Sequence, residues 1–286
     1  MTETFDAAWL ALREPADHRS RATAATTLLE RAWREHRWSR VLDLGAGTGS
    51  NLRYLAPRLP GGQHWTLVDH DADLLSRAAP PDPATGVSCV AGDLADAGLR
   101  LIQETRADLA TGSALLDLVS KAWLADLVSA CREARCAAHF ALTYDGTIQW
   151  HAAPGERRPD DDPDDGFVRR AVNAHQRRDK GLGPALGPMA GLTAETRFRA
   201  AGYRAWLLPS PWRLGPDDAS LARALVDGWE TAAVEEGRGP PADGQGAPGA
   251  AEVDRVRAWA ARRRARIAGG CYGLTVGHLD LLALPW

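Results

Sequence analysis

Short apolar runs alternate with stretches of helical periodicity through the first half of the chain. An apolar residue at every third or fourth position predicts an amphipathic helix, and a short apolar run bounded by polar residues or glycine predicts a strand. Strands that alternate with helices at this spacing form a parallel sheet with right-handed crossovers and helices on both faces. The predicted strands cover residues 40–44, 64–69, 87–91, 107–111 and 137–144, and the predicted helices cover residues 49–58, 71–78, 95–104 and 121–134.

The flanking parts of the chain add further helices and strands. Residues 5–36 have a helical pattern that Pro15 interrupts, which predicts two helices with a bend at the proline. Thr193 is a predicted N-cap, with its helix ending at Ala201 before Gly202. The other predicted elements are helices over residues 167–180, 217–236 and 251–268 and strands over residues 203–209, continuing in 211–214, and 273–284.

The stretch Val41-Leu42-Asp43-Leu44-Gly45-Ala46-Gly47-Thr48-Gly49-Ser50 joins the first predicted strand directly to a helix. A turn of this kind gathers unpaired backbone N–H groups at the helix N-terminus, and its glycines let a ligand approach them closely. A dinucleotide site has the spacing G-x-G-x-x-G, whereas here the third glycine comes one residue earlier. The stretch therefore predicts a nucleotide-binding turn of another kind.

This stretch resembles the S-adenosylmethionine site of class I (Rossmann-like) methyltransferases. The resemblance implies that Asp69, about 20 residues after the turn, binds the ribose, and that Asp93 and the Leu94 N–H bind the adenine. Residues 107–117 are similar to the family's fourth strand, whose end lies beside the sulfonium. The cofactor-binding residues so implied are Asp43, Gly45, Ala46, Gly47, Gly49, Asp69, His70, Gly92, Asp93, Leu94, Ser113, Ala114 and Leu115.

The resemblance also implies a doubly wound, seven-stranded, mostly parallel α/β sheet whose last strand is antiparallel. We expect residues 1–36 to be an N-terminal helical lid segment and residues 37–286 to be the Rossmann-like domain, with helical lid insertions at 146–191 and 215–270. Ligands of open α/β sheets bind outside the carboxyl ends of the strands, where these insertions begin.

A sulfonium methyl group is already activated, so a general base is needed only for an acceptor of high pKa. His139 and His278 are expected to be buried and hydrogen-bonded within strands. The candidate catalytic residues are Tyr144 and Asp145 at the end of the fifth strand and His151 and His175 in the insertion after it. The candidate substrate-binding residues are Arg19, Arg21, Tyr144, Asn173 and Arg178, with a solvated helix face as the equal alternative for Arg19 and Arg21.

Two polar segments have two readings each, and a third has one. The aspartates of residues 159–165 could bind a metal, but a solvated loop is favoured. Arg262, Arg263, Arg264 and Arg266 could attract an acidic substrate, and a solvated basic face is again favoured. Residues 237–249, rich in glycine and proline, are expected to be a mobile linker.

Composition limits the class of protein. The chain has 286 residues, 45% of them hydrophobic and 25% charged, with a net charge of −3, which indicates a soluble globule without a nucleic-acid duplex as obligate partner. No signal peptide or membrane span is recognisable. The four cysteines lack zinc-site spacing, so we expect reduced thiols, no metal and a cytoplasmic protein, as a monomer or homodimer.

Together these features predict S-adenosylmethionine-dependent methyl transfer to a small-molecule acceptor, with S-adenosylhomocysteine as product and O-methylation slightly favoured. Residues 113–116 lack the Asn/Asp-Pro-Pro-Tyr-like element of many relatives, which argues against nucleobase and glutamine N-methylation. Two alternatives remain: an NAD-dependent oxidoreductase, and a catalytically inactive scaffold that binds the cofactor.

Overall fold

The computed structural model describes residues 6–82, 85–152, 161–236 and 250–285. The chain divides into two compact units. Unit 1 comprises Met1–Asp145, Asp179–Pro211 and His278–Trp286, and unit 2 comprises Gly146–Arg178 and Trp212–Gly277. The predicted linker at 237–249 and residues 159–160 of the aspartate-rich segment lie outside the described residues.

The described strands form an eight-stranded sheet in the order β3-β2-β1-β4-β5-β8-β6, with β7 paired to β8. The neighbours β3-β2, β2-β1, β1-β4 and β4-β5 are parallel, whereas β8 is antiparallel to β6 and β7. The predicted α/β class, the mostly parallel sheet and the antiparallel last strand are thus confirmed. The strands are β1 (Arg40–Leu44), β2 (His64–Asp69), β3 (Gly86–Ala91), β4 (Leu109–Ser113), β5 (Ala137–His151), β6 (Arg204–Pro209), β7 (Trp212–Leu214) and β8 (Gly273–Leu284).

The eighth strand arises because residues 211–214 do not simply continue the sixth. β6 pairs with β8 as far as Pro209, Pro211 lacks the backbone N–H that a continuous ladder requires, and pairing resumes at Trp212 as β7.

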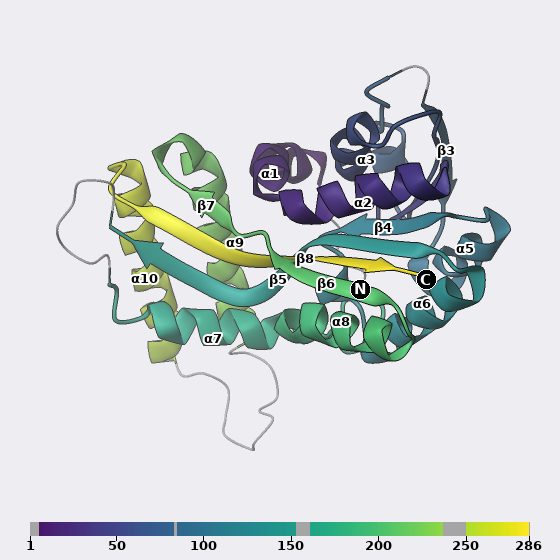
Figure 1. Ribbon diagram of the computed structural model, residues 1–286. Coiled ribbons are helices and arrows are strands. Elements are labelled where there is room, and N and C mark those ends of the chain that lie inside the picture. The colour runs from purple at the N-terminus through teal and green to yellow at the C-terminus, as the bar shows by residue number, and fades with distance from the viewer. Residues whose placement is uncertain (1–5, 83–84, 153–160, 237–249, 286) are drawn as a thin grey trace. The chain divides into compact units, whose positions relative to one another are not determined.

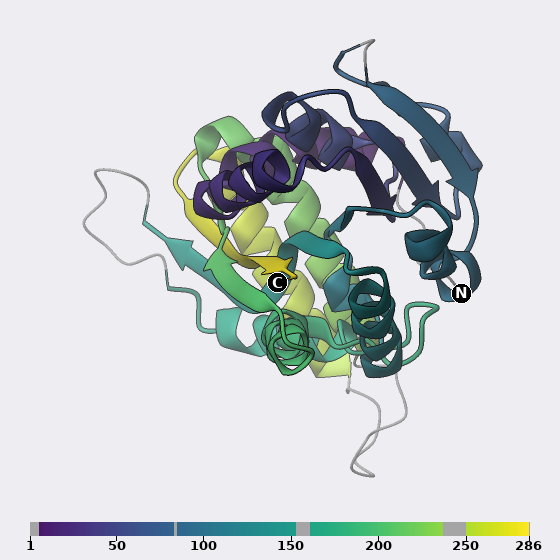
Figure 2. The same ribbon diagram turned by 45° about the vertical axis from the view of Figure 1, so that its right-hand side comes forward.

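Helices cover both faces of the sheet in unit 1. Figure 1 shows α2 and α3 on one side of the sheet and α6 and α8 on the other, and the purple N-terminal helices stay on the first side in Figure 2. The helices of unit 1 are α1 (Ala7–Ser20), α2 (Thr23–His36), α3 (Ser50–Leu55), α4 (Ala72–Leu75), α5 (Arg100–Glu104), α6 (Lys121–Ala134) and α8 (Ala190–Ala200), with short turns η1 (Ala56–Arg58), η2 (Leu94–Gly98), η3 (Leu116–Leu118) and η4 (Gly187–Met189).

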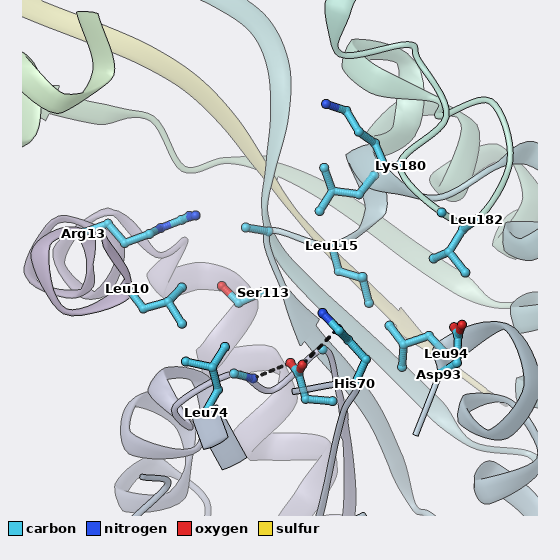
Figure 3. A pocket seen from close by; sticks show the side chains of 16 residues that line it. Leu10, Arg13, His70, Leu74, Asp93, Leu94, Ser113, Leu115, Lys180 and Leu182 are labelled. Atoms are coloured by element: carbon cyan, nitrogen blue, oxygen red, sulfur yellow. Dashed lines mark hydrogen bonds and ion pairs between the residues drawn. The ribbon is translucent and has the colours of Figure 1, made fainter. Parts of the chain in front are cut away.

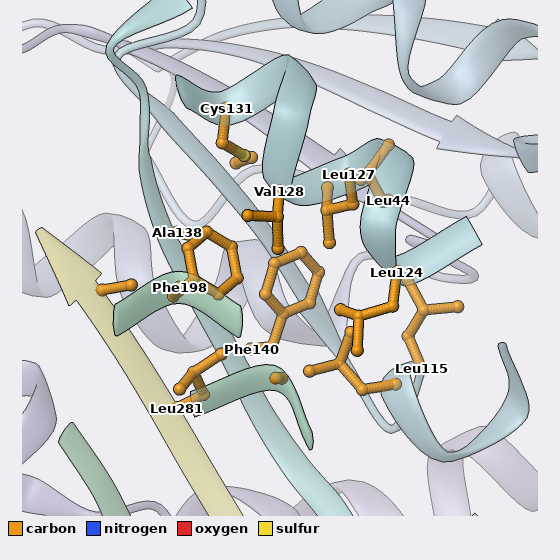
Figure 4. Close-up of a cluster of buried hydrophobic side chains, with 14 of the residues drawn as sticks. Leu44, Leu115, Leu124, Leu127, Val128, Cys131, Ala138, Phe140, Phe198 and Leu281 are labelled. Carbon is orange, nitrogen blue, oxygen red and sulfur yellow. The ribbon is translucent and has the colours of Figure 1, made fainter. Parts of the chain in front are cut away.

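Alternation of side chains along the strands gives each face its own core. Val41 of β1 packs with Leu29 and Trp33 of α2 and Leu52 of α3. Leu42, on the opposite face, belongs to a second cluster. Figure 4 shows Leu44 of the same strand in that cluster with residues of α6 and α8. In that cluster Phe140 of β5 and Phe198 of α8 are both fully buried. The central strands are therefore buried on both faces, as is usual for parallel sheets.

Two predicted helix boundaries are wrong. The N-terminal helices separate at Arg21, whose backbone is extended, and Pro15 lies inside α1. A proline in a helix removes one N–H donor, and the packing of α1 tolerates that loss here. Thr193 is not an N-cap, because η4 leads directly into α8 at Ala190 and the Thr193 hydroxyl donates to the Met189 carbonyl at 2.7 Å.

Unit 2 contains three helices among its described residues, together with β7 and the outer parts of β5 and β8. Ion pairs join its aspartate-rich segment to its basic helix: Arg262 contacts Asp162 and Asp164, and Arg263 contacts Asp165. These three aspartates are therefore paired with arginines, which the solvated-loop reading did not include. Arg263 is buried, against the solvated-face reading, whereas the Arg262 side chain is 45% exposed, in agreement with it. The helices are α7 (Asp165–His175), α9 (Ala219–Glu236) and α10 (Ala250–Ala268), with the short turn η5 (Pro216–Asp218).

The described cysteines are free thiols, and Cys131 and Cys136 are buried. Within the described ranges, no cluster of His, Cys, Asp or Glu has an arrangement that could hold a metal ion. None of the helices described has the length and apolar character needed to cross a membrane.

Candidate cofactor-binding site

A pocket lies in unit 1 at the carboxyl ends of the parallel strands (Figure 3). Its unfilled space is about 930 Å³, including the opening to solvent. Segments that are far apart in sequence meet there: the glycine turn after β1, the end of β2, the residues after β3 and the end of β4. The predicted cofactor residues that line the pocket are Gly45, Gly47, Asp69, His70, Asp93, Leu94, Ser113, Ala114 and Leu115.

The glycine turn has the backbone geometry that its sequence requires. Gly45, Gly47 and Gly49 have φ angles of +67°, +52° and +80°, in the left-handed region that favours glycine. A Cβ atom on Gly47 would lie 3.1 Å from Leu10 Cδ1, which is a tight contact with the N-terminal helix. The Ala46 N–H donates to the Val68 carbonyl at 3.0 Å and so attaches the turn to the end of β2. Glycine at position 47 leaves room for both Leu10 and a ligand.

Asp69 lies at the end of β2 and is held by backbone donors. Its Oδ2 accepts from the Gly47 N–H at 2.8 Å, and its Oδ1 accepts from the Asp71 N–H at 3.0 Å. His70 Nδ1 lies 3.2 Å from Oδ1. Although Asp69 is only 6% exposed, it forms part of the pocket wall. Because each carboxylate oxygen has more than one lone pair, Asp69 keeps acceptor capacity towards a ligand hydroxyl.

Asp93 and Leu94 form another wall of the pocket, after β3. Asp93 is exposed and caps the next turn, where its Oδ1 accepts from the Ala95 N–H at 2.8 Å. The Leu94 carbonyl accepts from the Trp123 indole N–H at 3.0 Å, which fixes this segment to α6. The Leu94 side chain and Asp93 therefore present an apolar surface and an acceptor at one end of the pocket (Figure 3).

The end of β4 brings Ser113, Ala114 and Leu115 to the pocket. Ala114 has φ +52°, and its N–H donates to the Ala141 carbonyl of β5 at 2.9 Å. Gly112 precedes this turn at a place where a Cβ atom would lie 2.9 Å from the Leu44 carbonyl oxygen. Only glycine lets β4 pass so close to β1, which keeps the Ser113 end in position.

Asp43, Ala46, Gly49 and Gly92 were also predicted cofactor residues, but they are not among the residues that line the pocket. Asp43 is completely buried beneath the turn, where its Oδ1 accepts from Asn51 Nδ2 at 2.9 Å. Burial raises the pKa of Asp43 to about 7, although the Asn51 hydrogen bond and the Arg21 charge act in the opposite direction. Asp43 thus supports the turn from inside the protein.

Four central strands each place one polar side chain on the same face of the sheet. Asp43 of β1 is in register with Thr111 of β4, and Thr111 is in register with His139 of β5. Asp280 of β8 shares the face of Leu282, which packs in the cluster beneath α2 and α3. All four residues are at most 1% exposed. This polar row lies beneath the N-terminal helices, next to the glycine turn.

His139 is neutral in this row, as its contacts require. Its Nδ1 lies 2.9 Å from the Leu281 carbonyl oxygen, so Nδ1 carries the proton and Nε2 accepts from Arg21 at 3.1 Å. Burial, assisted by the Arg21 charge, lowers the pKa of His139 to about 4. The expectation that His139 is buried and hydrogen-bonded is confirmed, and His278 is buried too, at 5% exposure.

The N-terminal segment contributes to the pocket through residues that sequence analysis did not select. Leu10 and Arg13 of α1 line it, and Arg13 Nε donates to Asp17 Oδ2 at 2.9 Å. Arg19 is exposed, and neither it nor Arg21 is among the lining residues. Arg21 is 4% exposed and bound within the protein, so the structure contradicts its reading as a solvated or substrate-facing arginine.

The four candidate catalytic residues are not among those that line the pocket. Tyr144 is buried in unit 1 with its ring 6.2 Å from that of His278, and Asp145 follows it at half-burial. In unit 2, His151 Nε2 lies 2.9 Å from Thr275 Oγ1, and His175 Nε2 lies 3.2 Å from Glu235 Oε2.

The two remaining substrate candidates also belong to unit 2 and bond within it. Asn173 donates to the Gly146 carbonyl at 3.0 Å, and Arg178 donates to the Glu235 carbonyl at 3.0 Å. The pocket-lining residues that were not predicted from the sequence are Leu10, Arg13, Leu74, Leu118, Lys180, Gly181 and Leu182. Among these residues, Leu10 and Arg13 had a signal in the sequence, which is their three-residue spacing on one helix face.

Comparison with known proteins supports the sequence motifs. Residues 41–135 match a family model described as a methyltransferase domain. A search of curated proteins found no match.

Solved structures similar to the chain include a SAM-dependent methyltransferase from Geobacter sulfurreducens in complex with S-adenosyl-L-homocysteine. It is 16% identical, with both chains fully covered and a TM-score of 0.43. A cyclopropane-fatty-acyl-phospholipid synthase-like protein from Lactobacillus casei is 14% identical over 94% of this chain and 98% of that one, with a TM-score of 0.48.

Phosphoethanolamine N-methyltransferase 2 from Haemonchus contortus, in complex with phosphomonomethylethanolamine and S-adenosylhomocysteine, is 12% identical over 87% of this chain, with a TM-score of 0.35. The present chain spans 50% of the length of that Haemonchus protein.

Proposed function

We propose that this chain, which contains a class I S-adenosylmethionine-dependent methyltransferase domain, transfers the methyl group of S-adenosylmethionine to a small-molecule acceptor. The proposal rests on one observation. The glycine turn, Asp69, Asp93 and the Ser113 end of β4, which lie in four separate stretches of the sequence, line a single pocket. A chance assembly of such residues would not place all of them at one edge of the sheet.

The residues present fit the cofactor. Asp69 offers acceptors for the ribose hydroxyls, and Asp93 offers an acceptor for the adenine amino group, with Leu74 and Leu94 as apolar flanks. Arg13 lies at the other end of the pocket from Asp93 in Figure 3, where its guanidinium suits the carboxylate of the methionine part.

When bound, the cofactor supplies an electrophilic methyl group on a positively charged sulfur. The protein's part is then to orient the cofactor and exclude water from the acceptor's approach. Leu10, Leu115, Leu118 and Leu182 give the pocket an apolar lining suited to that exclusion.

O-methylation is the acceptor chemistry that we favour. His70 and Lys180 bring nitrogen atoms to the pocket lining that can hydrogen-bond an acceptor oxygen, so an acceptor hydroxyl that ionises readily suits this pocket best. An acceptor oxygen that ionises readily becomes a nucleophile without a dedicated base. The protein then needs only to place it in line with the bond between the sulfur and the methyl group.

Isothermal titration calorimetry with S-adenosylhomocysteine tests the cofactor assignment. We expect saturable binding at micromolar affinity, and no comparable binding of NADH in a parallel titration. Tight NADH binding with no S-adenosylhomocysteine binding would favour an oxidoreductase instead.

The alternative of an inactive scaffold requires a different measurement. Incubation with methyl-labelled S-adenosylmethionine and a panel of small phenols, carboxylic acids and amines should yield a labelled product with at least one acceptor. Binding of S-adenosylhomocysteine without transfer to any acceptor would favour the scaffold.

A further inference from the structure

Arg21 is a buried arginine at the junction of the two N-terminal helices, and it bonds to three elements of unit 1. Its NH1 donates to Asn51 Oδ1 at 2.9 Å, and its NH2 donates to His139 Nε2 at 3.1 Å. Its Nε lies 3.6 Å from Asp280 Oδ2. The guanidinium carbon also lies 4.4 Å from the centre of the Tyr54 ring. At 4% exposure Arg21 cannot contact a solvent-borne ligand, so its role is internal.

Asn51 connects Arg21 to the glycine turn. Its Nδ2 donates to Asp43 Oδ1 at 2.9 Å and to Thr111 Oγ1 at 3.0 Å, while its Oδ1 accepts from Arg21. Both Nδ2 hydrogens and one lone pair of Oδ1 are thereby used, so the amide has a single orientation. Asp43 and Asn51 flank the turn, two residues before Gly45 and two after Gly49. The bond between them closes the turn at its base.

We propose that Arg21 is a positioning residue, which holds the cofactor turn, residues 45–49, in its binding conformation through Asn51. Without Arg21, the buried Asn51 Oδ1 loses its donor, and the Asp43 carboxylate loses a nearby positive charge. Both changes weaken the Asp43–Asn51 bond, so the turn is held closed less firmly.

Contacts nearer the surface also connect α1 to the glycine turn and the residues that follow it. Glu14 accepts from Arg53 Nε at 2.7 Å, and Arg53 also donates to the Thr48 carbonyl within the turn. His18 Nε2 lies 3.0 Å from the Ser50 carbonyl oxygen. These partly exposed contacts hold α1 against the turn, but none reaches the Asp43–Asn51 bond at its base. That bond depends on Arg21 alone among the described cations that contact Asn51.

The test compares Arg21→Met with Arg19→Met as a matched control, because Arg19 is an exposed arginine on the same segment. Titration at 15 °C, after circular dichroism has verified that each variant is folded, measures its affinity for S-adenosylhomocysteine. We expect Arg21→Met to weaken binding about tenfold or more and Arg19→Met to change it less than about twofold. Arg21→Lys, which retains one donor, should recover part of the loss.

A double-mutant cycle separates positioning from general destabilisation. If Arg21 acts through Asn51, then adding Arg21→Met to Asn51→Ser should cause no further loss of affinity. Amide hydrogen exchange in the ligand-free protein should also become faster at residues 45–50 in Arg21→Met and stay unchanged in Arg19→Met. A folded Arg21→Met protein that binds with parental affinity, or losses that multiply in the double variant, would overturn the proposal.

Should Arg21→Met not fold, Asn51→Ser tests the same link with Arg21 in place, and parental affinity in that variant overturns the proposal equally. The proposal rests on the proposed function in taking S-adenosylhomocysteine as the ligand. If the parent protein does not bind it, the cofactor assignment fails. The exchange experiment needs no ligand and still decides whether Arg21 orders the turn.

Discussion

The Asn51 side-chain amide donates to the buried carboxylate of Asp43 at 2.9 Å, across the base of the glycine turn. The second oxygen of Asp43, Oδ2, is buried without a hydrogen-bond partner among the described residues. An unpaired carboxylate oxygen in the protein interior disfavours the charged form. This explains why burial raises the pKa of Asp43 to about 7 despite the nearby Arg21 charge.

Stability should therefore depend on pH through Asp43 and His139 in opposite directions. The pKa of Asp43 rises from 3.8 to about 7 on folding, so its contribution is fully present below pH 3.8 and is lost as pH rises through about 7. The pKa of His139 falls from 6.5 to about 4, so its contribution is present above pH 6.5 and is lost as pH falls through about 4. Between about pH 4 and 6.5 the two effects oppose each other.

Asp43→Asn removes the pH dependence of stability that comes from Asp43 and leaves the one that comes from His139. Urea unfolding at several pH values should show that the free energy of unfolding of the parent, minus that of Asp43→Asn, decreases as pH rises from about 4 to 7. Asp73→Asn, at an exposed position, should give a difference that does not vary in this window. A constant difference for Asp43→Asn would contradict the raised pKa.

Asp69→Ala should weaken S-adenosylhomocysteine binding by about 1–3 kcal/mol, because ribose hydroxyls would lose a charged acceptor in a buried site. The same change removes the acceptor for the Gly47 N–H at 2.8 Å, so part of the loss comes from the turn. Calorimetric titration measures the total. Asp69→Asn keeps an acceptor oxygen and should lose less than Asp69→Ala. The ribose assignment is wrong if Asp69→Ala binds as tightly as the parent.

Gly47→Ala should impair both stability and binding. Its φ of +52° costs an L-residue about 1–2 kcal/mol, and the new methyl group would lie 3.1 Å from Leu10 Cδ1. Gly61→Ala is a matched control, because Gly61 has φ +86° but no atom within 4 Å of the place that a methyl group would take. Both variants should unfold more easily, whereas only Gly47→Ala should lose affinity for S-adenosylhomocysteine. If the two variants bind S-adenosylhomocysteine with equal affinity, Gly47 is not part of the binding site.

Much of this fold follows from local sequence. The apolar runs at 40–44 and 64–69 coincide with β1 and β2, because each is a continuous buried stretch that ends at a glycine or an acid. The pocket residues Gly45 and Gly47 were predicted in the same way, since their spacing reflects the backbone geometry of the turn, whereas Asp69 and Asp93 were implied by the family resemblance.

What the sequence did not reveal depends on contacts between distant segments. In the sequence, Arg21 is one of several arginines in a polar helical segment. Only its burial against Asn51 and His139 distinguishes it from Arg19. Lys180 reaches the pocket because its loop is anchored at Leu186, whose N–H donates to the Val119 carbonyl at 2.9 Å, far earlier in the chain. No local pattern encodes such a pairing.

The pairing of Arg263 with Asp165 in unit 2 allows a further prediction. The Arg263 side chain is 2% exposed, its guanidinium carbon lies 4.3 Å from the centre of the Trp150 ring, and it donates to both oxygens of Asp165. Asp165 also accepts from the Trp259 indole N–H at 2.7 Å. Asp165→Asn would remove the carboxylate that this buried guanidinium bonds, and breaking a buried pair costs about 3–5 kcal/mol.

Since the Asp165 side chain is 24% exposed, the lower end of that range is expected, near 3 kcal/mol. Chemical unfolding of Asp165→Asn, followed by circular dichroism, measures the change. Arg257→Met is the control, because Arg257 forms an exposed pair with Asp254 at 3.7 Å that is worth about 0–1 kcal/mol. If Asp165→Asn unfolds at the same denaturant concentration as Arg257→Met, the Arg263–Asp165 pair does not stabilise unit 2.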